Sequence, residues 1–143
     1  MIQIQGLDVS VAKFDIETLK SWIDSIIVSY KKKTGQVFFL FCSDDYLLDI
    51  NKTYLNHDYY TDIITFQTME DETIISGEMY ISLDRVKENA IQFQKSFHNE
   101  LHRVMAHGIL HLIGFKDKTD SEEHQMRNEE EKCLQLCSFI LKT

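Results

Sequence analysis

The sequence predicts a single α+β domain over residues 1–143, built from a small mixed β-sheet that helices cover. Three observations predict this class. The chain has the length of one domain. Short β-prone apolar runs occur between longer segments whose apolar residues recur at helical spacing. No internal repeat, low-complexity tract or linker divides the chain.

The first expected elements are a short strand and a helix. Ile2 and Ile4 alternate with polar residues, which is typical of a strand. Asp15 is a favourable N-cap for the helix that follows. The apolar residues at helical spacing in this helix are Leu19, Trp22, Ile23, Ile26, Ile27 and Tyr30. We expect the lysines at 31–33 in its last turn, where cations suit the helix dipole, and its end at 34–35. We interpret these lysines as a solvated helix end, with an RNA-facing patch as the alternative.

A buried strand and a second helix are expected next. Residues 37–42 form a continuous apolar run, which is typical of a strand buried on both faces. Ser43 is expected to cap the following helix, because two aspartates in the first turn suit the positive end of the helix dipole. The buried stripe predicted for this helix consists of Tyr46, Leu47, Ile50 and Tyr54.

Two neighbouring strands are expected after the polar loop at residues 56–60. One strand covers residues 61–66 and the other covers residues 77–82. The acidic turn at 69–72 separates them. Because the link is short and polar, we expect an antiparallel pair at a sheet edge.

Three helices are expected in the remainder of the chain. Asp84 is expected to cap the first, which would run through Val86, Ala90, Ile91 and Phe93. The chain is expected to bend near Ser96, and a second helix to run to Ile113. Thr119 and Glu122 have the spacing of a capping box that starts the last helix. The inward residues predicted for the last helix are Met126, Cys133, Leu134, Cys137, Ile140 and Leu141.

Composition limits the class of protein. The formal net charge of -8 argues against a protein that grips nucleic acid by charge alone. Three cysteines are too few for a disulfide framework, and we expect them to be buried apolar residues. No stretch approaches the roughly 18 apolar residues of a membrane span, and the N-terminus lacks a basic segment followed by an apolar run. We therefore expect a cytoplasmic protein.

The second of these three helices carries a candidate metal site near its end. His107 and His111 are four residues apart and share one helix face. Gly114 can stop the helix and turn the chain back, so that Asp117 reaches the same point. Two imidazoles and one carboxylate in an apolar setting are typical of one divalent ion with an open position for water. We predict a metal site at His107, His111 and Asp117, with zinc as the expected ion and iron, nickel or manganese as alternatives.

Other residues compete for the third ligand position. Asp120 and His124 are the rivals of Asp117, but His124 falls inside the predicted last helix. His98 and His102 are also four apart, although no glycine turn and acid follow them.

Arg103 lies four residues before His107 and therefore shares its helix face. It is a candidate for contact with a phosphate or another substrate oxyanion. An ordinary ion pair with Glu100 or an interaction with Asn99 is the alternative.

The spacing of the site resembles that of the metzincins, H-x-x-x-H-x-x-G-x-x-H, with aspartate in the last position. Gly108 replaces the glutamate of H-E-x-x-H, so the general base of a zinc peptidase is missing. No side chain is assigned as the catalytic group, and a metal-bound water is the expected reactive species. The small residue at 108 is interpreted as leaving room for a substrate group beside the metal.

Residues 107–117, HGILHLIGFKD, resemble the hallmark H-G-x-L-H-L-x-G-x-D-H of the YbeY family of bacterial endoribonucleases and rRNA maturation factors. The family's T-D-V-L-S-F segment is matched by residues 61–66, and its G-D/E strand by Gly77 and Glu78. Its leucine–asparagine pair is matched by Ile50 and Asn51. The resemblance extends from about residue 35 to about residue 135.

Two positions depart from the family pattern. The family's third histidine falls on Asp117, and the aspartate before it falls on Lys116. An arginine that the family carries shortly before T-D-V-L-S-F falls near Leu55. If that arginine holds phosphate, its role passes to another residue such as Arg103 or is lost.

The resemblance implies a metal-dependent, single-strand-selective endoribonuclease acting in 16S rRNA 3′-end maturation and ribosome quality control. Its implied partners are ribosomal RNA and small ribosomal subunit proteins, with no DNA and no membrane. The absence of the arginine at Leu55 supports one alternative, a non-catalytic ribosome-assembly factor with a structural metal. A metal hydrolase of another substrate is the second alternative, although the missing glutamate argues against it.

Overall fold

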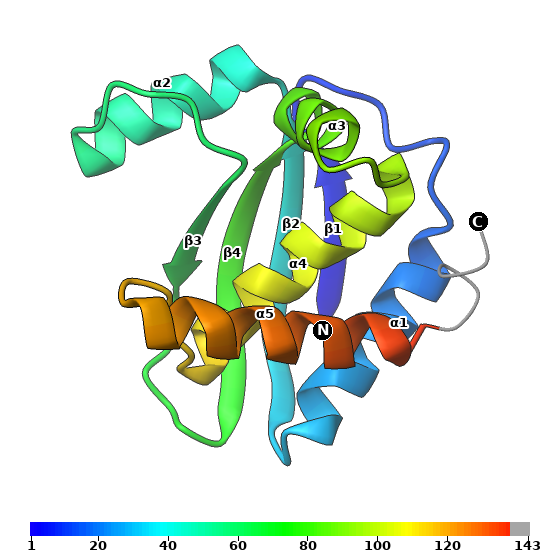
Figure 1. The fold of residues 1–143 in the computed structure, drawn as a ribbon. Helices are drawn as coiled ribbons and strands as arrows, with labels where there is room; N and C mark the ends of the chain where they lie inside the picture. Colours follow the sequence, from blue (N-terminus) through cyan, green and yellow to red (C-terminus); the bar gives the residue numbers. More distant parts are fainter. Residues whose placement is uncertain (138–143) are drawn as a thin grey trace.

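A computed structural model describes residues 1–137 and shows a mixed four-stranded sheet packed with helices (Figure 1). In chain order, the elements are β1 (Ile2–Gly6), α1 (Ile16–Ser29), β2 (Lys33–Cys42), α2 (Asp44–Leu55), β3 (Ile63–Gln67), β4 (Ile74–Ser82), α3 (Leu83–Gln92), α4 (Phe97–Ile113) and α5 (Asp120–Gln135). The strand order is β1-β2-β4-β3, with only the edge strand β3 antiparallel to its neighbour. The predicted α+β class and the antiparallel edge pair are confirmed.

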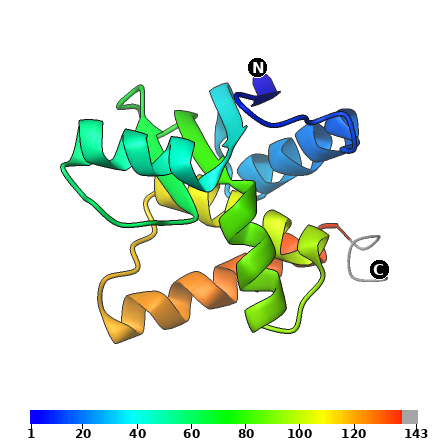
Figure 2. The ribbon, with the colours of Figure 1, turned by 90° about the horizontal axis from the view of Figure 1, so that it is seen from above.

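The main core lies between the sheet and the helices on one of its faces. Helix α4 lies against the sheet, and α5 lies over α4 on the side away from the strands (Figure 2). Helix α1 covers β1 and β2 on the same side, and the Trp22 indole donates a hydrogen bond of 2.9 Å to the Cys133 carbonyl of α5. Side chains that are fully buried in this core include Phe39, Phe41, Ile23, Met79, Ile81, Leu101, Met105 and Ile109.

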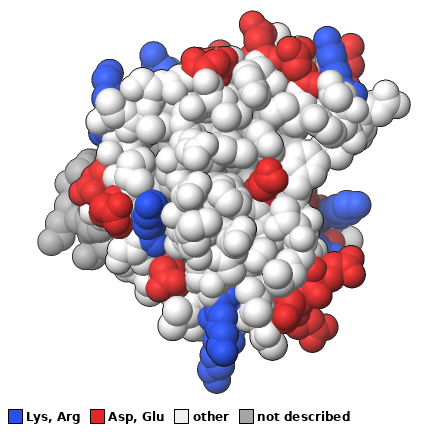
Figure 3. All heavy atoms as spheres, turned by 180° about the vertical axis from the view of Figure 1, so that it is seen from behind, with Lys and Arg blue, Asp and Glu red and all other residues white. Residues whose placement is uncertain are grey.

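The opposite face of the sheet is covered in part by α2. A second, smaller cluster there joins Leu47 and Ile50 of α2 to Cys42 and Ile64 of the sheet. Charged side chains lie mainly around the rim of this face (Figure 3). Within residues 1–137, no helix combines the length and apolar character needed to cross a membrane.

Local capping signals determine the ends of the helices around the site. The Ser96 hydroxyl accepts a hydrogen bond from the Asn99 amide at the start of α4. Gly114 ends α4 with φ 126°, as the sequence predicted. Thr119 and Glu122 form the predicted capping box of α5. These signals leave a short link at 114–119 between the two helices.

The end of α1 differs from the prediction. The helix stops at Ser29, and Lys31 has φ 61° in the turn after it. Lys33 is already the first residue of β2, and its amide donates to the Thr73 carbonyl at 2.8 Å. The lysines at 31–33 are therefore not the last turn of a helix, because the chain turns at Lys31 and pairing with the distant strand β4 begins at Lys33.

Two residues of the buried stripe predicted for α2 are exposed. Tyr46 and Tyr54 are 39% and 71% exposed. Helix α2 lies at the periphery and buries only a narrow stripe, so the apolar pattern overestimates its contact with the core. Ile91 and Phe93, at the end of α3, are also exposed. The cap of α3 is Ser82 rather than Asp84, whose carboxylate instead accepts from the Asp44 amide at 2.9 Å.

The remaining core predictions agree with the structure. Leu19, Trp22 and Ile23 of α1 are buried, as are Met126 and Leu134 of α5. Cys42, Cys133 and Cys137 are buried free thiols, as expected. Ile140 and Leu141 lie outside the described residues.

Candidate metal centre

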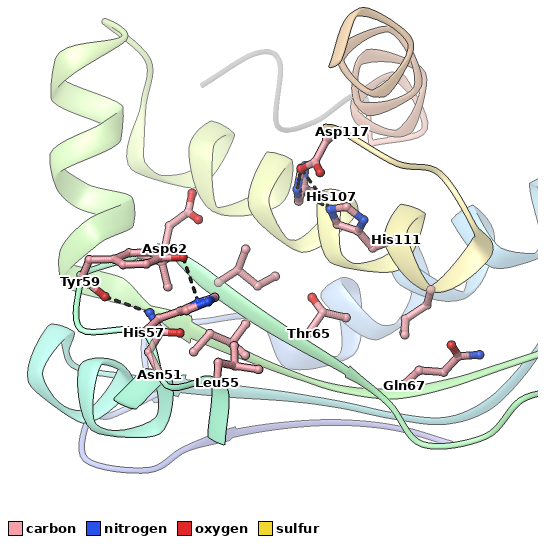
Figure 4. A pocket seen from close by; sticks show the side chains of 14 residues that line it. Asn51, Leu55, His57, Tyr59, Asp62, Thr65, Gln67, His107, His111 and Asp117 are labelled. Atoms are coloured by element: carbon pink, nitrogen blue, oxygen red, sulfur yellow. Dashed lines mark hydrogen bonds and ion pairs between the residues drawn. The ribbon is translucent and has the colours of Figure 1, made fainter. Parts of the chain in front are cut away.

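The two histidines of α4 and the aspartate of the following link meet at one point (Figure 4). The Nε2 atoms of His107 and His111 are 3.0 Å apart. Oδ2 of Asp117 lies 3.2 Å from each of these nitrogens. A tetrahedral ion with bonds of about 2.0–2.1 Å separates its ligand atoms by about 3.3–3.4 Å. The triangle therefore has nearly the dimensions that such an ion requires.

The helix end explains how Asp117 reaches the histidines. Gly114 has a positive φ that side-chain-bearing residues rarely adopt, which lets the chain reverse at once. The amides of Gly114 and Phe115 donate to the Leu110 carbonyl at 3.1 and 3.0 Å. The Phe115 ring then packs edge-on against Tyr30 at a centroid distance of 5.6 Å. The link is thereby held so that the carboxylate two residues later faces the helix.

His107 is oriented by a carboxylate from α5. Its Nδ1–H donates to Oε2 of Glu130 at 2.6 Å, and Glu130 is only 3% exposed. With the proton on Nδ1, the lone pair of Nε2 is free to face the triad, as a metal ligand requires. Sequence reasoning did not identify Glu130. The signal was present, because Glu130 falls at helical spacing among the buried residues Met126 and Cys133.

Arg103 lies between two buried carboxylates. It binds Glu100 through two hydrogen bonds of 2.9 and 2.6 Å and Glu130 through one of 3.1 Å. Glu100 is 1% exposed. Burial by itself would lower the pKa of Arg103. The hydrogen bonds and negative charges of Glu100 and Glu130 outweigh this effect, so the pKa of Arg103 is raised. The guanidinium thus forms the ion pair with Glu100 that was the alternative to phosphate contact.

The rival ligands lie apart from the triad. Asp120 and His124 are exposed on α5, and among residues 1–137 only His107, His111 and Asp117 form a group suited to a metal ion. His102 is buried with its ring centroid 4.7 Å from that of Trp22, and its Nδ1–H donates to the His98 carbonyl. Burial lowers the pKa of His102 to about 4, which keeps the ring neutral near pH 7.

Gly108 faces the sheet rather than the triad. A Cβ built on it would lie 2.8 Å from Sδ of Met79 and 2.9 Å from Cδ1 of Ile63. The space beside Gly108 is therefore filled by core side chains, and the interpretation of this glycine as room for substrate is wrong. Its small size instead lets α4 approach β3 and β4 closely.

A cleft of about 560 Å³ opens beside the triad. Its other walls are β3, the end of α2 and the loop that follows α2 (Figure 4). Leu55 lines this cleft and is 40% exposed. Asp62 also lines it, and burial raises the pKa of its carboxyl group although Arg103 and His107 oppose the shift. Among the described residues that line the cleft, none is a lysine or an arginine.

The sequence matches a known protein family and several of its members. The sequence model of the family described as Endoribonuclease YbeY matches residues 4–138. A protein of that name from Phocaeicola vulgatus is 45% identical over 139 residues, which cover 97% of this chain and 100% of the relative. Another, from Flavobacterium psychrophilum, is 49% identical over 117 residues, which cover 81% of this chain and 82% of the relative.

The fold is also found among solved structures. The solution structure of a Thermotoga maritima protein superposes with a TM-score of 0.71 at 30% identity, covering 95% of this chain and 88% of the other. Both the sequence match and the fold agree with the resemblance found in residues 107–117 and 61–66. The chain belongs to the endoribonuclease YbeY family.

Proposed function

We propose that this protein is a metal-dependent endoribonuclease that cleaves single-stranded RNA in 16S rRNA 3′-end maturation and ribosome quality control. The triangle of ligand atoms formed by His107, His111 and Asp117 carries the proposal, with 3.0 and 3.2 Å between the atoms. Membership of a family named for endoribonuclease activity supports the reaction class.

The donor set fits a divalent ion, and Zn²⁺ is the ion we propose. Two neutral imidazoles and one carboxylate are ordinary ligands of zinc, and three protein ligands leave one position open. When bound, such an ion supplies Lewis-acid activation of a phosphate oxygen and of an attacking oxygen.

The chain's own residues supply positioning. Glu130 holds the His107 ring by the bond to Nδ1, and Arg103 holds Glu130 in turn. Asp117 contributes the negative charge of the triad. The cleft beside these residues gives an extended substrate access to them, with Thr65 and Gln67 of β3 along its wall.

The negative charge of the protein supports a role for partner proteins in bringing the RNA to the cleft. The formal net charge is -8, and the described residues that line the cleft include no lysine or arginine. RNA affinity that depends on phosphate contacts needs lysine or arginine side chains. We therefore propose ribosomal RNA as the substrate, small ribosomal subunit proteins as the partners that deliver it, and the cytoplasm as the location.

The test combines metal analysis with RNA cleavage. We expect purified protein to hold one ion per chain and to cut a labelled single-stranded RNA while sparing the same strand in a duplex. Asp117→Ala should lose both the ion and the cleavage. Asp120→Ala removes an exposed carboxylate three residues away and should change neither. Cleavage that persists in Asp117→Ala, or unsubstituted protein without stoichiometric metal, contradicts the proposal.

A non-catalytic ribosome-assembly factor is the second candidate, and Leu55 favours it. This side chain lines the cleft near the position at which the resemblance places the family's arginine, so any phosphate contact that the arginine would make is missing. In this case the metal would be structural. The same assay separates the two, because an assembly factor would keep its ion and leave the RNA intact.

A further inference from the structure

We propose that His57 and Tyr59 form a stacking site for a nucleobase of the RNA, on the far side of the cleft from the metal triad. This inference rests on the proposed function. Both residues belong to the loop between α2 and β3, and both line the cleft that also contains His107, His111 and Asp117 (Figure 4).

The two rings are already stacked on one another. Their centroids are 5.1 Å apart and their planes differ by 21°. The Tyr59 hydroxyl and His57 Nδ1 are also within hydrogen-bond distance, at 3.0 Å. Tyr59 is 56% exposed, so much of the pair remains available to a ligand. Aromatic rings exposed in this way bind unpaired bases by stacking.

A buried asparagine holds the pair in place. Asn51 is 1% exposed, and its Nδ2 donates to the Tyr59 carbonyl at 2.9 Å. The backbone carbonyl of Asn51 accepts a hydrogen bond from the His57 amide at 3.1 Å. Asn56 lies between Asn51 and His57 in the chain and has a left-handed conformation with φ 55°. It ends α2 and turns the loop toward the cleft. Because the loop is already held at both aromatic positions, a base that binds there does not have to order it, and the entropic cost of binding is lower.

The charges of the cleft favour a base over a phosphate at this position. Asp62 and Asp117 line the cleft, and the described lining residues include neither lysine nor arginine. A phosphate away from the triad would therefore meet carboxylates but no lysine or arginine of the described lining. A neutral base avoids this repulsion and gains stacking with the rings. Leu55 adds an apolar wall beside them.

The site also gives a physical reason for single-strand selectivity. A base in a duplex has both faces covered by its neighbours and cannot stack on a protein ring. A base in a single strand can leave its neighbours at small cost. An unpaired strand can therefore place a base on the His57–Tyr59 pair while its phosphate reaches the triad. A strand in a duplex cannot do both.

The experiment measures binding by fluorescence anisotropy with zinc-loaded protein. The probes are a labelled oligoadenylate of about eight nucleotides and the same backbone without bases, each checked on a gel for integrity after the titration. We expect Tyr59→Ala to weaken oligoadenylate binding at least about fivefold, the lower end of one lost stacking contact. Tyr59→Phe keeps the ring and should keep the affinity. The abasic strand should bind the unsubstituted protein and Tyr59→Ala equally.

The matched control is Tyr60→Ala. Tyr60 is also half exposed, but it bonds to Asp45 and lies 5.3 Å from the Arg85 guanidinium, outside the cleft. Its removal should leave RNA affinity unchanged. Equal oligoadenylate binding by Tyr59→Ala and the unsubstituted protein overturns the stacking site, as does an equal loss with the abasic strand. If the unsubstituted protein neither binds nor cuts RNA, the proposed function itself fails.

Discussion

The carboxylate of Glu130 on α5 accepts a hydrogen bond of 2.6 Å from Nδ1 of His107 on α4. The bond fixes the imidazole tautomer and turns Nε2 toward Asp117. It joins two helices at the point where the candidate metal ligands converge. Four predictions follow from this arrangement and from its surroundings.

Glu130→Gln should weaken zinc binding roughly 10-fold to 100-fold, because the neutral amide no longer supports the His107 ring as a carboxylate does. Competition with a chromogenic chelator measures the zinc affinity without any RNA present. Glu131→Gln is the control, since Glu131 is the exposed neighbour on the same helix. Equal zinc affinities for the two variants would show that the bond does not position a ligand.

Arg103→Met should destabilise the fold by about 3–5 kcal/mol, because Glu100 and Glu130 would remain buried without their cation. Denaturant unfolding of the metal-free protein measures the change. Lys132→Met breaks the exposed pair with Glu129 and should cost less than about 1 kcal/mol. A similarly small effect at Arg103 would mean that water already solvates the buried pair.

His102 should make the fold sensitive to mild acid. Burial lowers its pKa to about 4 in the folded protein, against 6.5 as the reference value. Between these values the unfolded chain binds a proton that the folded protein excludes. His102 therefore costs no unfolding free energy above pH 6.5, and the unfolding free energy falls as the pH drops from 6.5 toward 4. The loss attributable to this group is about 3 kcal/mol. His102→Gln should remove it, so unfolding free energies of the two proteins that decline in parallel from neutral pH to pH 4 would refute the assignment.

Leu55→Arg should place a cation in the cleft and tighten binding of single-stranded RNA. One added phosphate contact should also steepen the dependence of log affinity on log salt concentration by about 0.7 for a single strand. Anisotropy titrations at several salt concentrations measure both effects. Leu7→Arg adds the same charge at another exposed leucine, outside the cleft, and should leave the slope unchanged. A slope that rises equally in both variants would indicate only a general effect of net charge.

The parts of the site that follow local rules could be predicted from the sequence. Helical spacing brings His107 and His111 onto one face, and a glycine ends the helix where its positive φ is tolerated. The capping box of Thr119 and Glu122 limits the link that carries Asp117. These features depend on residues within a few positions of one another, which is why the sequence shows them.

The surroundings of the triad were decided by tertiary packing. Glu130 is 23 positions from His107, and the loop of His57 and Tyr59 reaches the same cleft from the other side of the sheet edge. Pairing with β4 likewise made Lys33 the first residue of a strand, directly after the turn at Lys31. The sequence by itself determined the order of the elements, the three converging candidate ligands, and the helix caps at Asp15, Ser43, Gly114 and Thr119. Only the tertiary structure decided which buried charges support those ligands and which side chains face the cleft, because such contacts depend on how distant elements pack.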